Sequence, residues 1–289
     1  MSLHDVLHVL LHALLDSAKV LPFLFVTYLC MELLEHKAGD GVKKAISRAG
    51  KAGPALGGVL GLVPQCGFSA MASGLYAGRV VTVGTVLAVF LSTSDEMIPV
   101  LLGASVPPVR VLVILGIKLV IAVACGFLLD LLMRGHSRPM HVEELCEEEH
   151  CHCEQGVLIS ALRHTLHIFA FILVVNLLLG FVLELVGEAV IATWLRDIPV
   201  LGECVAALIG LIPNCAASVT IATLYARGVI SAGAMLAGLL TGAGAGLLVL
   251  FRTNRHLKEN LLFVALLFGI GAVCGILLNV TGLAAALGL

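Results

Sequence analysis

Long apolar runs alternate with short polar segments along the whole chain, and most of the runs have the length of a membrane-spanning helix. A helix needs about 20 apolar residues to cross the hydrocarbon layer. Runs of that length lie at 18–36, 81–103, 109–133, 165–186, 229–250 and 260–283. Two further apolar segments, 52–78 and 203–226, hold a proline near the middle, which removes a helical hydrogen bond and predicts a break. The pattern predicts an all-α polytopic membrane protein.

The composition supports this assignment and excludes several other classes of protein. Of the 289 residues, 60% are hydrophobic and only 12% are charged, which a single water-soluble core cannot accommodate. The net charge of -2 gives no reason to expect a nucleic-acid partner, and no P-loop motif indicates an ATPase. Residues 1–17 lack the basic start of a signal peptide, so we expect them to form an amphipathic helix of the mature protein.

The chain repeats itself at an offset of 149 residues. Residues 61–91 align with 210–240 without a gap, and the identical positions include a proline, a cysteine two residues later and a Leu-Tyr-Ala triplet. A fixed internal period indicates two copies of one structural unit. The predicted organisation is a first membrane repeat over 18–133, a polar loop over 134–156 and a second membrane repeat over 157–289.

The basic residues favour copies that are inverted with respect to each other. Cytoplasmic loops are enriched in lysine and arginine. If each break-centred segment folds back as a hairpin or forms two short spans, the copies are inverted, and twelve basic residues lie on one side against four on the other. Parallel copies give ten against six. We therefore expect two inverted repeats, a cytoplasmic central loop and both termini outside.

The two proline-centred breaks have the chemistry of a transport site. Broken segments at matching positions of inverted repeats meet near the membrane midplane in many secondary transporters, where unwound backbone lines a cavity. Each break here adds a thiol and an amide side chain, which together make up the predicted substrate-binding set: Pro64, Gln65, Cys66, Pro213, Asn214 and Cys215. The alternative is a pair of proline-kinked helices whose small residues only pack at the kink.

A second polar interruption lies at 92–96, within an otherwise apolar span. Carboxyl groups at membrane depth are costly when ionised and unpaired, so Asp95 and Glu96 are expected to bind protons or cations, or to pair with a cation. Ser92 and Ser94 belong to the same predicted coupling element, and Lys118 on the next span is the expected counter-charge. The alternative is an ion pair with Lys118 that fixes the register of the two helices.

The central loop concentrates side chains that bind metals, surrounded by glutamates. Thiolates and imidazoles are ligands of soft and borderline ions such as zinc or copper(I). The candidate ligands are His141, Cys146, His150, Cys151, His152 and Cys153. No CxxC pair occurs, so we expect a chelating arm rather than a structural zinc site, and no cofactor that the protein requires. The alternative is an acidic linker with incidental histidines and cysteines.

These motifs together resemble a known family. The segments GLVPQCG and GLIPNCA, the duplicated LYA triplet, the STSDE interruption and the loop rich in His, Cys and Glu are similar to those of bacterial and archaeal permeases described as ten-transmembrane heavy-metal or arsenic efflux proteins. The resemblance covers essentially the whole chain. It implies a prokaryotic cytoplasmic-membrane permease with five elements in each half, which exports a metal or metalloid species.

The leading hypothesis is a secondary transporter, not an enzyme, that exports a metal or metalloid with proton coupling. A first alternative is a carrier of a small organic or sulfur-containing anion with a metal-responsive loop. A second is an intramembrane enzyme, although neither an HExxH nor a GxSxG motif occurs. The expected partners are the ion substrate and the bilayer. The sequence does not determine the oligomeric state, and a homo-oligomer is one of the alternatives.

Overall fold

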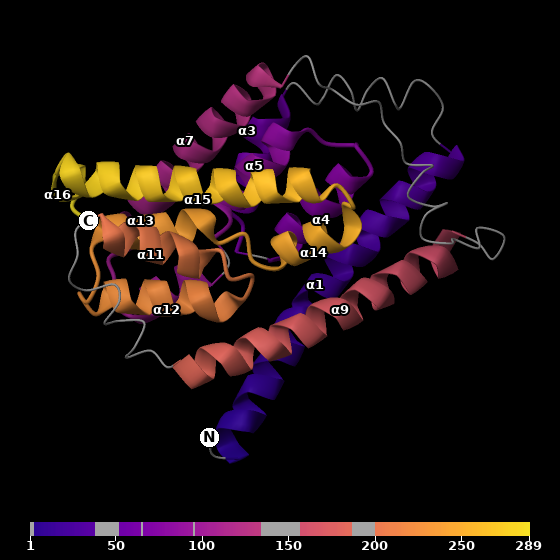
Figure 1. Cartoon of the computed structure of the whole chain (residues 1–289), viewed down its shortest axis with the longest axis horizontal. Helices are drawn as coiled ribbons and strands as arrows, with labels where there is room; N and C mark the ends of the chain where they lie inside the picture. Colours follow the sequence, from indigo (N-terminus) through magenta and orange to yellow (C-terminus); the bar gives the residue numbers. More distant parts are fainter. Residues whose placement is uncertain (1–2, 38–51, 65, 95, 134–156, 187–199) are drawn as a thin grey trace.

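The computed structural model describes residues 3–37, 52–64, 66–94, 96–133, 157–186 and 200–289. These residues form helices joined by turns and contain no β-strand (Figure 1). The first half contains α1 (Leu3–Lys37), α3 (Gly53–Gly61), α4 (Cys66–Ala77), α5 (Val83–Ser92), α6 (Met97–Gly103) and α7 (Pro108–Leu132). The second half contains α9 (Val157–Val186), α11 (Leu201–Gly210), α12 (Cys215–Ala226), α13 (Ala232–Thr241), α14 (Ala245–Thr253), α15 (Leu257–Val280) and the short α16 (Leu283–Ala286).

The helix boundaries repeat with the sequence. α12 begins and ends 149 residues after α4, and α13 begins and ends 149 residues after α5. The pairs α1 and α9, α3 and α11, α6 and α14, and α7 and α15 correspond in the same way within a few residues. Equivalent helices therefore occupy equivalent places in two successive structural units.

Six stretches of the described chain are long and apolar enough to cross a membrane, which makes this an integral membrane protein. They are Leu10–Cys30, Val83–Gly103, Pro108–Leu132, Ala161–Val182, Ala232–Thr253 and Leu257–Val280. These stretches overlap the six runs predicted from hydropathy. Val83–Gly103 and Ala232–Thr253 are each interrupted in the middle, because α5 gives way to α6 and α13 gives way to α14. α1 continues without a boundary through residue 17, so the predicted amphipathic segment is part of one long helix.

The break-centred segments form pairs of short helices that reverse the chain direction. A Cβ added at Gly53 would meet Thr85, and one added at Gly61 would meet Ser92, so α3 and α5 run in the same direction. α4 connects the end of α3 with the start of α5 and must therefore return the chain. At nine residues and about 1.5 Å per residue, α3 is also too short to cross a bilayer alone.

The two halves contact each other through exchanged partners. α4 of the first half packs on α14 of the second, whereas α12 of the second half packs on α6 of the first. The long helices α1 and α9 cross side by side along one flank (Figure 1), with Leu24 and Ile172 in the buried cluster that they share. This arrangement brings the interrupted segments of both halves towards the middle of the molecule.

Candidate functional site

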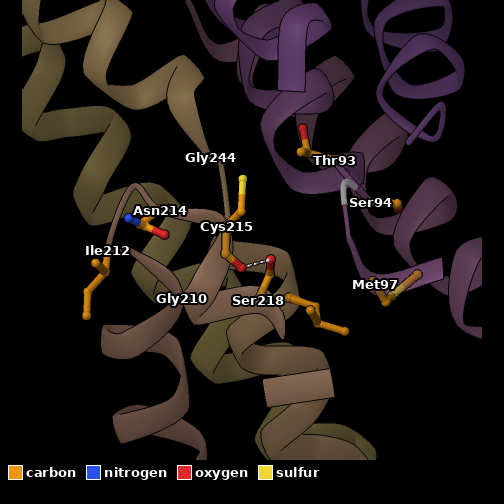
Figure 2. A pocket seen from close by; sticks show the side chains of 11 residues that line it. Thr93, Ser94, Met97, Gly210, Ile212, Asn214, Cys215, Ser218 and Gly244 are labelled. Carbon is orange, nitrogen blue, oxygen red and sulfur yellow. Dashed lines mark hydrogen bonds between the residues drawn. The ribbon is translucent and has the colours of Figure 1, made fainter. Parts of the chain in front are cut away.

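A pocket lies where the interruptions of the two halves meet (Figure 2). One wall comes from the break between α5 and α6 in the first half. The other comes from the break before α12 and the break between α13 and α14 in the second half. The lining residues are Thr93, Ser94, Met97, Gly210, Ile212, Asn214, Cys215, Ser218, Leu239, Gly242 and Gly244. Interrupted backbone from both repeats therefore surrounds one site. Of the two proline-centred breaks, the described lining includes residues of the second, among them Asn214 and Cys215, while the first half contributes its 93–97 interruption.

The break before α12 places a thiol at the start of a helix. Proline cannot donate the hydrogen bond that would continue α11, and Asn214 then caps α12 by accepting a hydrogen bond from the Ala216 amide at 2.8 Å. The Cys215 side chain is half-buried and lines the pocket, and its carbonyl accepts a 2.8 Å hydrogen bond from Ser218 (Figure 2). The positive end of the helix dipole at this position favours a thiolate or another anion.

On the first-half side of the pocket, hydroxyl groups donate hydrogen bonds to the backbone carbonyls at the end of α5. Thr93 and Ser92 donate to the Val89 carbonyl at 2.7 and 3.1 Å, and Ser94 donates to the Ser92 carbonyl at 2.8 Å. All three hydroxyl-bearing side chains are buried. These bonds hold the unwound segment in a defined shape without a helix, which is tolerated at membrane depth where protein covers the backbone.

Lys118 joins the two halves behind the pocket. Its side chain is fully buried, and its ammonium group donates to the carbonyls of Thr93 in the first half and Leu239 in the second, the latter at 2.9 Å. Both carbonyl-bearing residues line the pocket. An ammonium at this depth is costly unless polar groups surround it, so a lysine here indicates a specific role. Lys118 was predicted as a counter-charge, but these two carbonyl partners were not foreseen.

Glu96 pairs with a lysine other than Lys118. Its carboxylate accepts a 3.1 Å hydrogen bond from Lys19 of α1, and the two side chains are 28% and 51% exposed. Such an exposed pair contributes little to stability because water screens it.

The residues of the proline-centred breaks differ in exposure. Pro64 lies exposed in the first break, and Cys66 begins α4. Pro213 lies half-buried in the second break.

The remaining predicted site residues lie outside the described residues. They are Gln65, Asp95 and the six candidate ligands of the central loop, His141, Cys146, His150, Cys151, His152 and Cys153. Within the described part of the chain, no group of three or more His, Cys, Asp or Glu side chains could hold a metal ion.

Two polar networks were not predicted from the sequence. Asn214 donates to the Asn176 carbonyl at 3.3 Å, and the buried Asn176 amide donates to Ser17 of α1 at 3.1 Å, which ties the break to the α1–α9 pair. The signal in the sequence that could have pointed to this network is Asn176, an amide side chain inside an apolar span. The second network joins Tyr76 to Glu259 at 2.8 Å. Its members are separated by 183 residues, so no local pattern points to it.

Comparison with known proteins finds one family. A family model described as "Putative, 10TM heavy-metal exporter" matches residues 5–190, almost two thirds of the chain. The matched region contains the first half, the central loop and α9. No curated protein and no solved structure matches.

Proposed function

We propose that this chain, which belongs to the 10TM heavy-metal exporter family, is a secondary transporter that carries a metal or metalloid species through the pocket between its halves. One observation carries the proposal: the pocket combines interrupted backbone from both repeats with the thiol of Cys215. Sulfur is a preferred ligand of soft metals and metalloids. Binding at the junction of two repeats suits a site that faces each side of the membrane in turn.

Two features support an inverted arrangement of the repeats. The return of the chain through α4 leaves three crossings in the first half, formed by α1, by α5 with α6, and by α7. An odd number of crossings starts the second half on the opposite side. The hydrogen bond between Tyr76 and Glu259 agrees, because parallel copies would put the loops beside these residues at opposite ends of the molecule.

The side of each loop follows from the same arrangement. With the strongly basic loops in the cytoplasm, the central loop 134–156 is cytoplasmic and both termini lie outside. The membrane is the prokaryotic cytoplasmic membrane. In this orientation the histidines and cysteines of the central loop gather zinc or a similar ion on the side from which an exporter takes its substrate.

Residues around the pocket have distinct roles in this proposal. Cys215 and its repeat equivalent Cys66 bind the substrate, assisted by Asn214 and Gln65 and by the backbone freed at Pro64 and Pro213. Asp95 and Glu96, next to Ser92 and Ser94, exchange protons during transport. Lys118 holds the Thr93 and Leu239 carbonyls together and so couples the first-half interruption to the second half.

Transport by reconstituted protein tests the proposal. Proteoliposomes with native protein are given a panel of metal ions, arsenicals and organic anions, with and without a pH gradient. We expect flux of one metal or metalloid, accelerated by the gradient. Cys215→Ser should reduce that flux roughly tenfold, since even outer-shell changes at metal sites cost that much affinity. Asp95→Asn should remove the dependence on the pH gradient.

Cys204→Ser is the matched control, because Cys204 is also half-buried in the second half but does not line the pocket. It should transport at the native rate. Equal flux through native protein and Cys215→Ser would refute the assignment of the site. Selective flux of an organic anion would instead establish the alternative carrier function.

A further inference from the structure

The two equivalent hairpin helices are packed to different extents. α4 packs closely along α14 and α1, whereas α12 packs less extensively on α6 and α9. Ser69 and Tyr76 of α4 are 1% and 2% exposed, but their repeat equivalents Ser218 and Tyr225 are only half-buried. Identical residues at equivalent positions therefore have different surroundings. The two halves are therefore more alike in sequence than in structure.

A polar cluster closes the end of the molecule at which α4 terminates. One carboxylate oxygen of Glu259 accepts from the Tyr76 hydroxyl at 2.8 Å and pairs with Arg79 at 2.9 Å. The Arg79 guanidinium also lies 4.9 Å from the centre of the Tyr76 ring and 3.5 Å from His256. Asn254 donates to the same Glu259 oxygen at 3.4 Å. This cluster joins the 78–82 loop of the first half to the 254–256 loop of the second.

A second contact lies between this cluster and the pocket. The Ser73 hydroxyl is fully buried and donates to the Gly246 carbonyl of α14 at 2.7 Å. A Cβ at Gly246 would meet the backbone of Ser69, so α4 and α14 are in close contact. The route from the 78–82 loop to the pocket is thus filled by packed helices.

The opposite end cannot form the same cluster. At the repeat-equivalent positions, Gly228 replaces Arg79, Arg110 replaces Glu259 and Pro107 replaces His256. Tyr225 lies within electrostatic range of Arg110. These two residues are the repeat equivalents of Tyr76 and Glu259. The carboxylate that organises one end of the molecule is therefore replaced by a cation at the other.

We infer that Tyr76, Arg79 and Glu259 form a gate that closes the 78–82 end of the pocket, and that the pocket is reached from the opposite end, between α12 and α6. This inference rests on the proposed transport function. A two-state transporter opens one end while it closes the other. The Arg79 and Glu259 side chains are 13% and 23% exposed, so the pair is half-buried and holds this end closed until water or another group replaces the lost contact.

The pocket thiol itself reports which end is open. A bulky, membrane-impermeant maleimide is added to either face of membranes that contain the full chain, and labelling of Cys215 is followed by peptide-resolved mass spectrometry. Labelling of an Arg255→Cys variant identifies the gated face. We expect native Cys215 to react at least about tenfold faster from the opposite face, and Glu259→Gln and Tyr76→Phe to raise its rate from the gated face several-fold.

Arg110→Gln is the matched control, because Arg110 is the repeat equivalent of Glu259 at the other end. It should leave labelling from the gated face unchanged. If Glu259→Gln does not accumulate, the Tyr76→Phe comparison and the native ratio still test the gate. The double variant Arg79→Glu with Glu259→Arg should label more slowly from the gated face than Glu259→Gln, because it restores the ion pair although not the Tyr76 hydrogen bond.

Equal labelling of native Cys215 from both faces, or unchanged ratios in Glu259→Gln and Tyr76→Phe, would overturn the gate. The labelling requires no substrate, so its result is separate from the transport assay. A protein that transports but shows no change in labelling refutes the gate alone. A protein whose labelling changes as expected but that carries none of the tested species keeps the gate and refutes the assigned cargo.

Discussion

Asp130 and Asn279 occupy equivalent positions in the two halves and cap equivalent helices. One Asp130 oxygen accepts from the Gly84 amide at 2.8 Å and the other accepts from the Thr82 hydroxyl at 2.7 Å. The Asn279 side-chain oxygen accepts from the Gly233 amide at 3.2 Å. An oxygen acceptor at the first turn of α5 and of α13 is therefore retained, whereas the negative charge is not. The contact with the helix amide therefore recurs in the second half with a neutral side chain.

Substitutions at Asp130 separate the acceptor from the charge. We expect Asp130→Asn to retain near-native stability, because its oxygen can still accept from Gly84, as Asn279 accepts from Gly233. Asp130→Leu should lower the free energy of unfolding by about 1–2 kcal/mol, the cost of losing a helix cap. Thermal unfolding of the detergent-solubilised protein measures both. If Asn proves as harmful as Leu, the carboxylate charge has a role beyond capping.

Paired glycines determine how closely the long helices approach the interrupted ones. A Cβ at Gly84 would collide with the Gly126 carbonyl, and one at Gly233 would collide with the Gly275 carbonyl. α5 and α7 thus pack backbone against backbone, as do α13 and α15. Contact of this kind is the usual way in which membrane helices associate, since lipid supplies no hydrophobic drive between them.

Adding one methyl group at this contact should separate the helices. We expect Gly84→Ala to lower stability by about 1–3 kcal/mol, as overpacking of a close contact does. Gly116→Ala is the matched control on α7, because no neighbouring atom of the described residues lies within 4 Å of the point that its Cβ would occupy. That variant should be neutral or slightly stabilising, since alanine favours a helix more than glycine does. Similar melting temperatures for both variants would show that α5 and α7 can move apart at little cost in stability.

The helices and their duplication were predictable because they depend on local pattern. Apolar runs of spanning length predicted the six membrane stretches, and the matched prolines predicted the breaks before Cys66 and Cys215. The length of α1 was not predicted. The amphipathic pattern of residues 1–17 predicted a separate segment, but one helix continues through 3–37 and accommodates Pro22 inside it.

The site was predictable only in part, because its partners come from distant parts of the chain. Ser94, Asn214 and Cys215 lie where helices are interrupted, and all three line the pocket. The contact of Lys118 with the Leu239 carbonyl joins residues 121 positions apart. Backbone carbonyls leave no mark in the sequence, so such a partner follows only from the packing of the two halves.

The relative direction of the two halves determines on which face of the membrane each loop lies, and this face can be measured loop by loop. The 104–107 and 254–256 loops follow equivalent helices, α6 and α14. Inverted halves put these loops on opposite faces of the membrane, whereas parallel halves put them on the same face. Ser105 and Arg255 are both exposed and suit single-cysteine reporters.

We expect an impermeant thiol reagent to label Arg255→Cys from the cytoplasmic face and Ser105→Cys from the outer face. The contact of Tyr76 with Glu259 requires the 78–82 loop to be on the side of Arg255, so a cysteine replacing Arg79 should label with Arg255→Cys. Ser105→Cys should label with Arg227→Cys, because Tyr225 lies near Arg110 at that end. Labelling of Ser105→Cys and Arg255→Cys from the same face would exclude inverted halves and, with them, any gate that alternates between two equivalent ends.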